Sequence, residues 1–317
     1  MHILKIGSRK SDLATWQART VSESLKKQGI NSEIVQIETR GDRIQNTPIA
    51  AIGGRGVFTE AIEKQLLNGG IDIAVHSAKD MPSQIDEKFT LIAFTKREKS
   101  HDVIISNNTN LNIENKEHKI TIGTSSVRRI AMLNHYYPHT HTVEMRGNLQ
   151  TRVKKMEAGQ CDALMLAYAG VKRMGYDSLV VHTFPEDRFT PAVGQGALAI
   201  EAPATMDEDL KQRIRACLNH DETESLLLTE RAFLRELQGG CSIPVFALAQ
   251  AIDGDTLRLT GGLISLDGTQ VIRRTDTAPT CDGVHLGRSL GRYILDNKGS
   301  ELLHEIRTIQ SKQQNTA

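Results

Sequence analysis

The hydrophobic and polar positions in the first half of the chain alternate between the period of a strand and that of a helix. Residues 2–7 (HILKIG) alternate as a strand does, and residues 12–29 (DLATWQARTVSESLKKQG) form an amphipathic run that closes at Gly29. The same order returns at residues 119–123 (KITIG) and 127–137 (VRRIAMLNHYY). The pattern predicts a strand followed by a helix in both places.

The parallel between the two copies continues downstream. Residues 32–42 and 140–148 both predict a strand and an Arg-Gly turn, while residues 58–80 and 149–170 both predict a helix, a glycine stop and a buried strand. Strands that alternate with helices predict mostly parallel sheets, whose ligands lie beyond the carboxyl ends of the strands. We therefore expect an α/β fold of two similar domains that face each other across a cleft.

The rest of the chain predicts a hinge and a third domain. Two extended segments, 97–106 and 188–202, flank the second copy, as two crossings between domains would. At Asp221 a capping signal opens an apolar-faced helix, and strands separated by Asp-Gly turns follow, as in a small α+β domain. The predicted boundaries are 1–95 with 195–216 for domain 1, 96–194 for domain 2 and 217–317 for domain 3.

Composition narrows the class of partner. The 39 basic residues nearly balance the 38 acidic ones, and aromatic residues are only 4%, which argues against nucleic acid as a partner. The sequence has no export signal and no window with the roughly 18 apolar residues of a membrane span. We therefore expect a cytoplasmic protein with no membrane partner. Its 4 cysteines lack a Cys-x-x-Cys spacing, so neither a metal site nor a disulfide framework is expected.

Basic side chains gather where the predicted strands end. A guanidinium pairs with a carboxylate or phosphate through two parallel hydrogen bonds, and the N-terminus of a helix attracts anions. Each arginine alone could equally be a solvated helix charge. Their recurrence in both copies predicts a site for a ligand with several acidic groups. The arginines are Arg9, Arg128, Arg129, Arg146, Arg152 and Arg173.

Three more positions could carry chemistry. The segment IDIAVHSAKDMP ends a buried strand at Lys79 and Asp80. A carboxylate there can stabilise a cation or move protons, or it can simply cap a turn. Lys79 could form a Schiff base. The residues around Cys241, in QGGCSIPV, leave three interpretations open: a nucleophile, an attachment point or an ordinary buried thiol.

Nine segments, in this order, resemble the hydroxymethylbilane synthase family, also called porphobilinogen deaminase. They are IGSRKSDLATWQ, TRGD, GGRGVFTEAIE, DIAVHSAKDMP, GTSSVRR, RGNLQTR, DALMLAYAGVKRMG, PAVGQGALAIE and GGCSIP. The resemblance implies two domains like those of type II periplasmic binding proteins, flanking a cleft, and a small α+β domain that carries the cysteine. It also implies a monomer.

The resemblance further implies an activity. Four porphobilinogen molecules join head to tail with loss of ammonia on a dipyrromethane cofactor, and water then releases hydroxymethylbilane. Cys241 would hold this cofactor by a thioether bond, and Asp80 would be the catalytic residue. The implied cofactor-binding residues are Lys79, Ser126, Arg128 and Arg129, and the implied substrate-binding residues are Arg9, Ser11, Arg146, Arg152 and Arg173. Arg55 stands in GGRG where GGKG is common in the family, which puts any substrate contact of that residue in doubt.

Two rival interpretations make different predictions. Two α/β domains around an anion site would also suit a solute-binding protein or the effector domain of a regulator. Such a protein has neither a covalent group nor turnover. If the enzyme formed a Schiff base through Lys79, borohydride would trap the substrate on that lysine.

Overall fold

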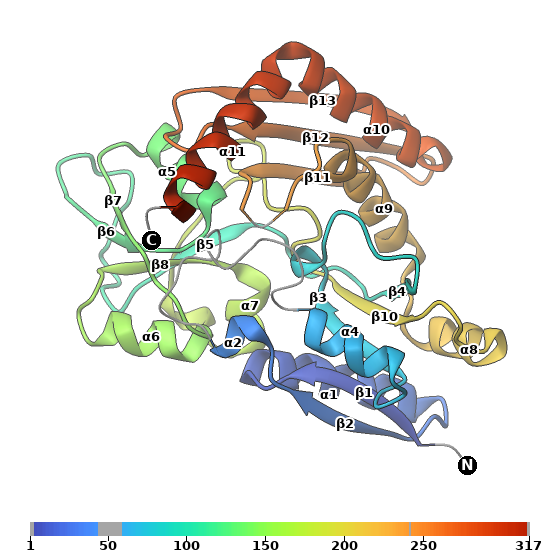
Figure 1. Cartoon of the computed structure of the whole chain (residues 1–317). Coiled ribbons are helices and arrows are strands. Elements are labelled where there is room, and N and C mark those ends of the chain that lie inside the picture. Colours follow the sequence, from blue (N-terminus) through green and yellow to red (C-terminus); the bar gives the residue numbers. More distant parts are fainter. Residues whose placement is uncertain (1–2, 44–58, 241, 316–317) are drawn as a thin grey trace.

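The computed structural model describes residues 3–43, 59–240 and 242–315, and its strands form three sheets (Figure 1). Two sheets have five strands each, and the third has three. We call the two larger sheets with their helices the first and second lobes, and the remainder the third unit.

The first lobe has the strand order β2-β1-β3-β10-β4. β1 runs parallel to β2 and β3, whereas β10 is antiparallel to both of its neighbours. The strands are β1 (Leu4–Arg9), β2 (Ser32–Ile37), β3 (Ile73–Ser77), β4 (Phe89–Phe94) and β10 (Leu198–Pro203). The helices are α1 (Asp12–Lys27), α2 (Arg40–Arg43), α4 (Glu60–Leu67) and α8 (Glu208–Leu218).

The second lobe repeats this plan in the order β7-β6-β8-β5-β9, with β5 antiparallel to its neighbours. Its strands are β5 (Asp102–Ile105), β6 (Thr121–Gly123), β7 (His141–Val143), β8 (Ala163–Ala167) and β9 (Val180–Thr183). Its helices are α5 (Val127–Tyr136), α6 (Leu149–Glu157) and α7 (Tyr168–Arg173). The matching strand orders confirm the predicted pair of similar α/β domains.

The two extended segments predicted from the sequence are the crossings between the lobes. The chain leaves β4 of the first lobe and enters β5 of the second, and it leaves β9 of the second and enters β10 of the first. Each crossing therefore supplies the one antiparallel strand of the sheet that it enters. This exchange explains why the sheets are mostly, but not wholly, parallel.

In the described part of the chain, the third unit is a three-stranded meander with three helices, which is an α+β arrangement as predicted. The strands β11 (Val245–Ala251), β12 (Thr256–Ile264) and β13 (Val271–Pro279) pair antiparallel in sequence order. The helices are α9 (Asp221–Glu236), α10 (Gly283–Ile294) and α11 (Ser300–Asn315). The hydrophobic core of the second lobe takes in Phe246 and Ile264 of this unit, and Leu227 of α9 packs with residues of the first lobe. The third unit thus packs against both lobes.

Two elements differ from the prediction. The Arg-Gly turn expected after β2 is the short helix α2, and α8 was not predicted. Asp207 caps α8 by accepting a hydrogen bond from the Leu210 amide at 2.9 Å, and Ile214 and Leu218 face the core. This helix passes through the proposed junction at 216–217. The domain boundaries remain a prediction.

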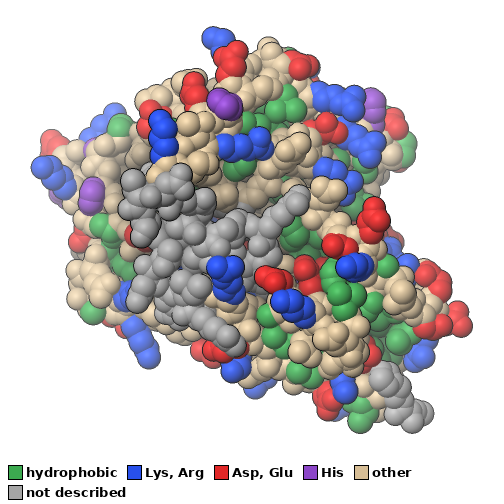
Figure 2. Space-filling view, viewed as in Figure 1, with side chains coloured by type: hydrophobic (Ala, Val, Ile, Leu, Met, Phe, Trp, Pro, Cys, Tyr) green, Lys and Arg blue, Asp and Glu red, His purple; other side chains and the backbone are tan. Residues whose placement is uncertain are grey.

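Charged side chains of both signs are interspersed on the visible face, which agrees with the balanced composition (Figure 2). Among the described residues, no helix is long and apolar enough to cross a lipid bilayer.

Candidate active site

A cavity of about 1360 Å³ brings together residues from both lobes and the third unit. Its lining includes ten of the residues predicted to bind or react: Arg9, Ser11, Lys79, Asp80, Ser126, Arg128, Arg129, Arg146, Arg152 and Arg173. Gly240 and Ser242 also line it. Cys241 and Arg55 lie outside the described residues.

Asp80 enters the cavity at the end of β3. The strand is buried, and a single 3₁₀ turn, Ala78–Asp80, follows it before Pro82. The Asp80 carboxylate makes no hydrogen bond or ion pair with another described residue. Its oxygens are therefore available to a ligand, which the interpretation as a turn cap would not allow.

Lys79 lies beside Asp80 and among other cations. Burial, together with the nearby Arg129 charge, lowers the pKa of Lys79 to about 8. Its ammonium donates a long hydrogen bond, 3.5 Å, to the side-chain carbonyl of Gln195. Lys79 is thus mostly charged at neutral pH and loses its proton as the pH rises through about 8.

Arg128 and Arg129 lie in the first turn of α5. Both are buried, and they share one carboxylate. Asp102, at the start of β5, accepts from Arg128 Nη2 at 2.7 Å and from Arg129 Nη2 at 2.8 Å. Burial alone would raise the pKa of Asp102, but the two guanidiniums outweigh it and hold that pKa well below the ordinary range. Asp102 therefore uses part of the guanidinium donors that were predicted to bind an acidic ligand.

The remaining arginines of the second lobe are anchored through one part of the side chain only. Arg152 Nε donates to the Gly147 carbonyl at 2.8 Å, and Arg173 Nη2 donates to that of Gly196 at 2.7 Å. Burial, with Arg129 and Arg146 nearby, lowers the pKa of Arg152 to about 10. Arg146 is buried, and its Nη1 has no hydrogen-bond partner among the described residues. A buried donor without an acceptor is costly, so it marks a place for an anionic ligand.

Three predicted residues lie near the starts of helices and differ in the contacts that they make. Arg9 forms a salt bridge with Asp42, whose pKa it lowers against the effect of burial. The Ser11 hydroxyl caps α1 by accepting from the Ala14 amide at 3.3 Å. Ser126 precedes α5, and its hydroxyl makes no capping bond. Ser11 therefore has a structural task as well as its predicted one.

Sequence reasoning missed three of these polar partners: Asp42, Asp102 and Gln195. Each is defined by contacts with residues far along the chain, such as the 2.9 Å bond from Gln195 Nε2 to Asp102. A weak signal existed for Gln195, which lies between two glycines in AVGQGALA. No local pattern distinguishes Asp102 from any residue that begins a buried strand.

The site suits an anion with several acidic groups, because Lys and Arg side chains outnumber carboxylates in the lining of the cavity. The described residues contain no group of three or more His, Cys, Asp or Glu side chains that could hold a metal ion. In the same part of the chain, Cys161, Cys217 and Cys281 are free thiols.

The fold and the site together define a protein with two similar α/β lobes that enclose a cationic cleft. A periplasmic substrate-binding protein of an ABC transporter from Coxiella burnetii is 12% identical, with a TM-score of 0.42, and the match covers 70% of this chain and 94% of that one. The matching strand orders of the two lobes establish the α/β fold.

Two family models identify the chain more closely. The dipyrromethane cofactor binding domain of porphobilinogen deaminase matches residues 4–212, and its C-terminal domain matches residues 225–296. A porphobilinogen deaminase from Desulfosudis oleivorans is 53% identical, over 97% of this chain and 99% of that one. Another, from Cytophaga hutchinsonii, is 48% identical, over 98% of each chain.

The chain belongs to the porphobilinogen deaminase family. It is a transferase of tetrapyrrole biosynthesis that condenses four porphobilinogen molecules into hydroxymethylbilane on a dipyrromethane cofactor. This membership sets aside the solute-binding, regulatory and Schiff-base interpretations.

Proposed function

We propose that the cleft is where the pyrrole chain grows, and that Asp80 is its catalytic residue. The observation that carries the proposal is the convergence of ten predicted residues, from segments far apart in sequence, on one cavity. Among them the Asp80 carboxylate has no described partner, while cations surround it.

The described residues fit a dipyrromethane group. Each of its two pyrrole rings carries an acetate and a propionate, so it brings several carboxylates into the cleft. Arg146 Nη1 is a buried donor without a described partner, and Arg128, Arg129, Lys79 and Ser126 lie along the same cavity. Cys241 would hold the group through a thioether, because its neighbours Gly240 and Ser242 line the cleft. When bound, the group supplies the pyrrole carbon on which the chain is extended.

Asp80 then acts on the substrate. Loss of ammonia from porphobilinogen leaves a cation next to the pyrrole ring, and a carboxylate in a partly buried cleft lowers the free energy of that cation. The same carboxylate can accept the pyrrole N–H and move a proton. The ion pairs of the neighbouring arginines leave Asp80 free for this role.

The carboxylates of the substrate and of the growing chain would be bound by Arg9, Ser11, Arg146, Arg152 and Arg173. Arg152 and Arg173 each donate to a backbone carbonyl, which fixes the side chain and leaves other guanidinium nitrogens for ligand. We propose in addition that the chain works as a monomer in the cytoplasm, without a nucleic-acid partner.

The covalent link is tested by intact mass. The purified wild-type protein should exceed its sequence mass by the mass of a dipyrromethane group, and the excess should disappear in Cys241→Ser. The control is Cys281→Ser, which changes an exposed free thiol and should keep the excess. Active wild-type protein with the bare sequence mass would refute the thioether.

The catalytic assignment is tested by Asp80→Asn. This variant keeps the shape of the side chain but removes its charge, so turnover should fall by about a hundredfold or more while the covalent group stays. Asp86→Asn is the matched control, because Asp86 is an exposed residue of the same segment. Normal turnover of Asp80→Asn would show that another group stabilises the cation.

A further inference from the structure

Gln195 uses every hydrogen-bonding position of its side-chain amide. Its Nε2 donates to the Ser100 carbonyl at 2.6 Å and to Asp102 Oδ1 at 2.9 Å. Its Oε1 accepts from Arg129 Nη2 at 3.4 Å and from Lys79 Nζ at 3.5 Å. An amide has two donors and two acceptor positions, and all four are occupied.

The partners also fix which way this amide points. If it were turned over, its NH₂ group would face two cations, and its oxygen would face a carboxylate and a carbonyl. All four contacts would then be repulsive. The side chain is almost fully buried, at 1% exposure, so water cannot compensate. The carbonyl therefore points at Lys79 and Arg129.

Two glycines place the residue. Gly194 and Gly196 have φ of +75° and +101°, a region that glycine adopts without strain. A Cβ on Gly196 would lie 2.4 Å from the Glu98 carbonyl oxygen, and one on Gly194 would lie 2.9 Å from the Ala78 carbonyl carbon. The backbone around Gln195 is thus closely packed against both the first crossing and the turn that contains Asp80.

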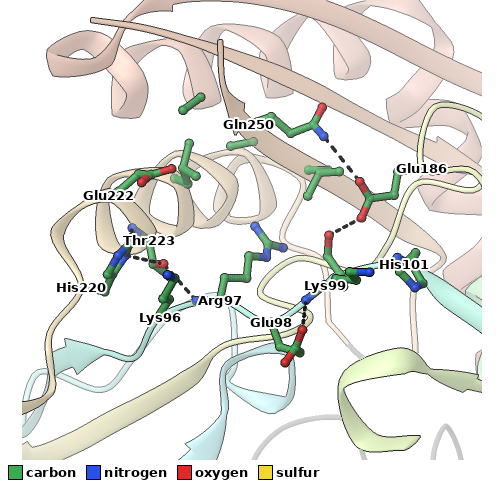
Figure 3. Close-up of a pocket in the computed structure, with 15 residues that line it drawn as sticks. Lys96, Arg97, Glu98, Lys99, His101, Glu186, His220, Glu222, Thr223 and Gln250 are labelled. Atoms are coloured by element: carbon green, nitrogen blue, oxygen red, sulfur yellow. Dashed lines mark hydrogen bonds between the residues drawn. The ribbon is translucent and has the colours of Figure 1, made fainter. Parts of the chain in front are cut away.

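The first crossing is held from a second side. A cavity of about 420 Å³ is lined by residues of that crossing, of α9 and of β11 (Figure 3). The Ser100 hydroxyl donates to Glu186, which also accepts from Gln250. These hydrogen bonds connect the first crossing to Glu186 and, through it, to β11. They therefore hold in place the segment whose Ser100 carbonyl accepts from the Gln195 amide.

Gln195 connects cations of the two lobes. Lys79 belongs to the first lobe and Arg129 to the second, and like charges at close range repel. The Gln195 carbonyl lies between them and accepts from both. The other charged groups that act on Lys79 are Asp80, Asp102 and Arg128.

We propose that Gln195 is a positioning residue, which holds the Lys79 ammonium and the Arg129 guanidinium side by side so that both face the same carboxylate in the cleft. The role rests on the proposed function, since it takes that carboxylate to belong to the cofactor or to the growing chain. Gln195 acts through the two cations and does not itself take part in the chemistry.

Two substitutions at one position give opposite expectations. Gln195→Met keeps the length of the side chain but removes the amide, and with it the acceptor that both cations share, so the KM for porphobilinogen should rise about tenfold or more. The charged form of Lys79 also loses support, and the alkaline limb of the kcat/KM profile should move to lower pH. Gln195→Glu places a negative charge beside Lys79, and the same limb should move to higher pH.

The matched control is Thr223→Val. Thr223 is a buried residue that accepts from the Arg97 amide of the same crossing at 3.1 Å and touches neither cation. This variant should change neither the KM nor the position of the alkaline limb. If it reproduces the effects of Gln195→Met, those effects come from a weakened crossing, and the positioning role is wrong.

Intact mass separates this proposal from the function on which it rests. If Gln195→Met carries the covalent group and keeps the wild-type KM and pH profile, the positioning role is overturned while the proposed function stands. If the wild-type protein carries no covalent group, the proposed function fails whatever the Gln195 variants do.

Discussion

At the scale of single residues, the site combines cations that are paired with a protein carboxylate and a cation that has an unused hydrogen-bond donor. Asp102 neutralises part of the charge of Arg128 and Arg129, whereas Arg146 keeps a buried donor without a described acceptor. An arginine cluster without Asp102 would place several like charges in a partly desolvated cleft before any ligand arrived. The internal carboxylate therefore makes the arginine cluster compatible with folding.

This view predicts a large cost for Asp102→Asn. The variant leaves two buried guanidiniums without their counter-charge, and the free energy of unfolding should fall by about 3–5 kcal/mol. Because the folded-state pKa of Asp102 is lowered from 3.8, its contribution is present above about pH 4 and is lost as the pH falls further. Urea unfolding at pH 7 and at pH 3 measures both effects.

Asp209→Asn provides the comparison for that measurement. Asp209 is an exposed residue in the first turn of α8, so its replacement should change the free energy of unfolding by no more than about 0.5 kcal/mol. An Asp102→Asn variant as stable as Asp209→Asn at pH 7 would contradict the account of the buried cluster.

At the scale of elements, the sequence predicted those parts of the fold that short periods encode. The strand–helix pairs β1–α1 and β6–α5 and the meander β11–β13 follow local patterns of two or 3.6 residues. The missed helix α8 had a usable signal, because Asp207 precedes Leu210, Ile214 and Leu218 at helical spacing. The signal was missed because α8 contains many charged residues and ends only a few residues before α9 begins.

The site was predictable to the extent that it depends on strand ends. Parallel strands bring their carboxyl ends together at one edge of a sheet, so the basic residues at the ends of β1 and β3 had to lie near one another, as did those that follow β6 and β7 in the second sheet. The partners of those residues could not be foreseen. Asp102 joins Arg128 across 26 positions, and Gln195 joins Lys79 across 116. Only the tertiary fold decides such contacts.

At the scale of the whole molecule, Glu230 connects the three parts of the fold. This buried residue of α9 accepts from Arg97 of the first crossing, from the Gly194 amide of the second at 2.8 Å, and from the Ala249 amide of β11 at 2.9 Å. The position of the third unit therefore depends on both crossings. Gly194 is also adjacent to Gln195, so Glu230 supports the loop that faces the cleft.

Glu230→Gln should consequently loosen the whole assembly. It leaves the largely buried Arg97 charge without its carboxylate, and the free energy of unfolding should fall by about 3–5 kcal/mol. Amide hydrogen exchange should also speed up at both crossings, because both are hydrogen-bonded to this one side chain. Glu222→Gln is the matched control, since Glu222 is exposed on the same helix. Equal stability and equal exchange in the two variants would show that the crossings are held independently of Glu230, and that the third unit does not set the geometry of the cleft.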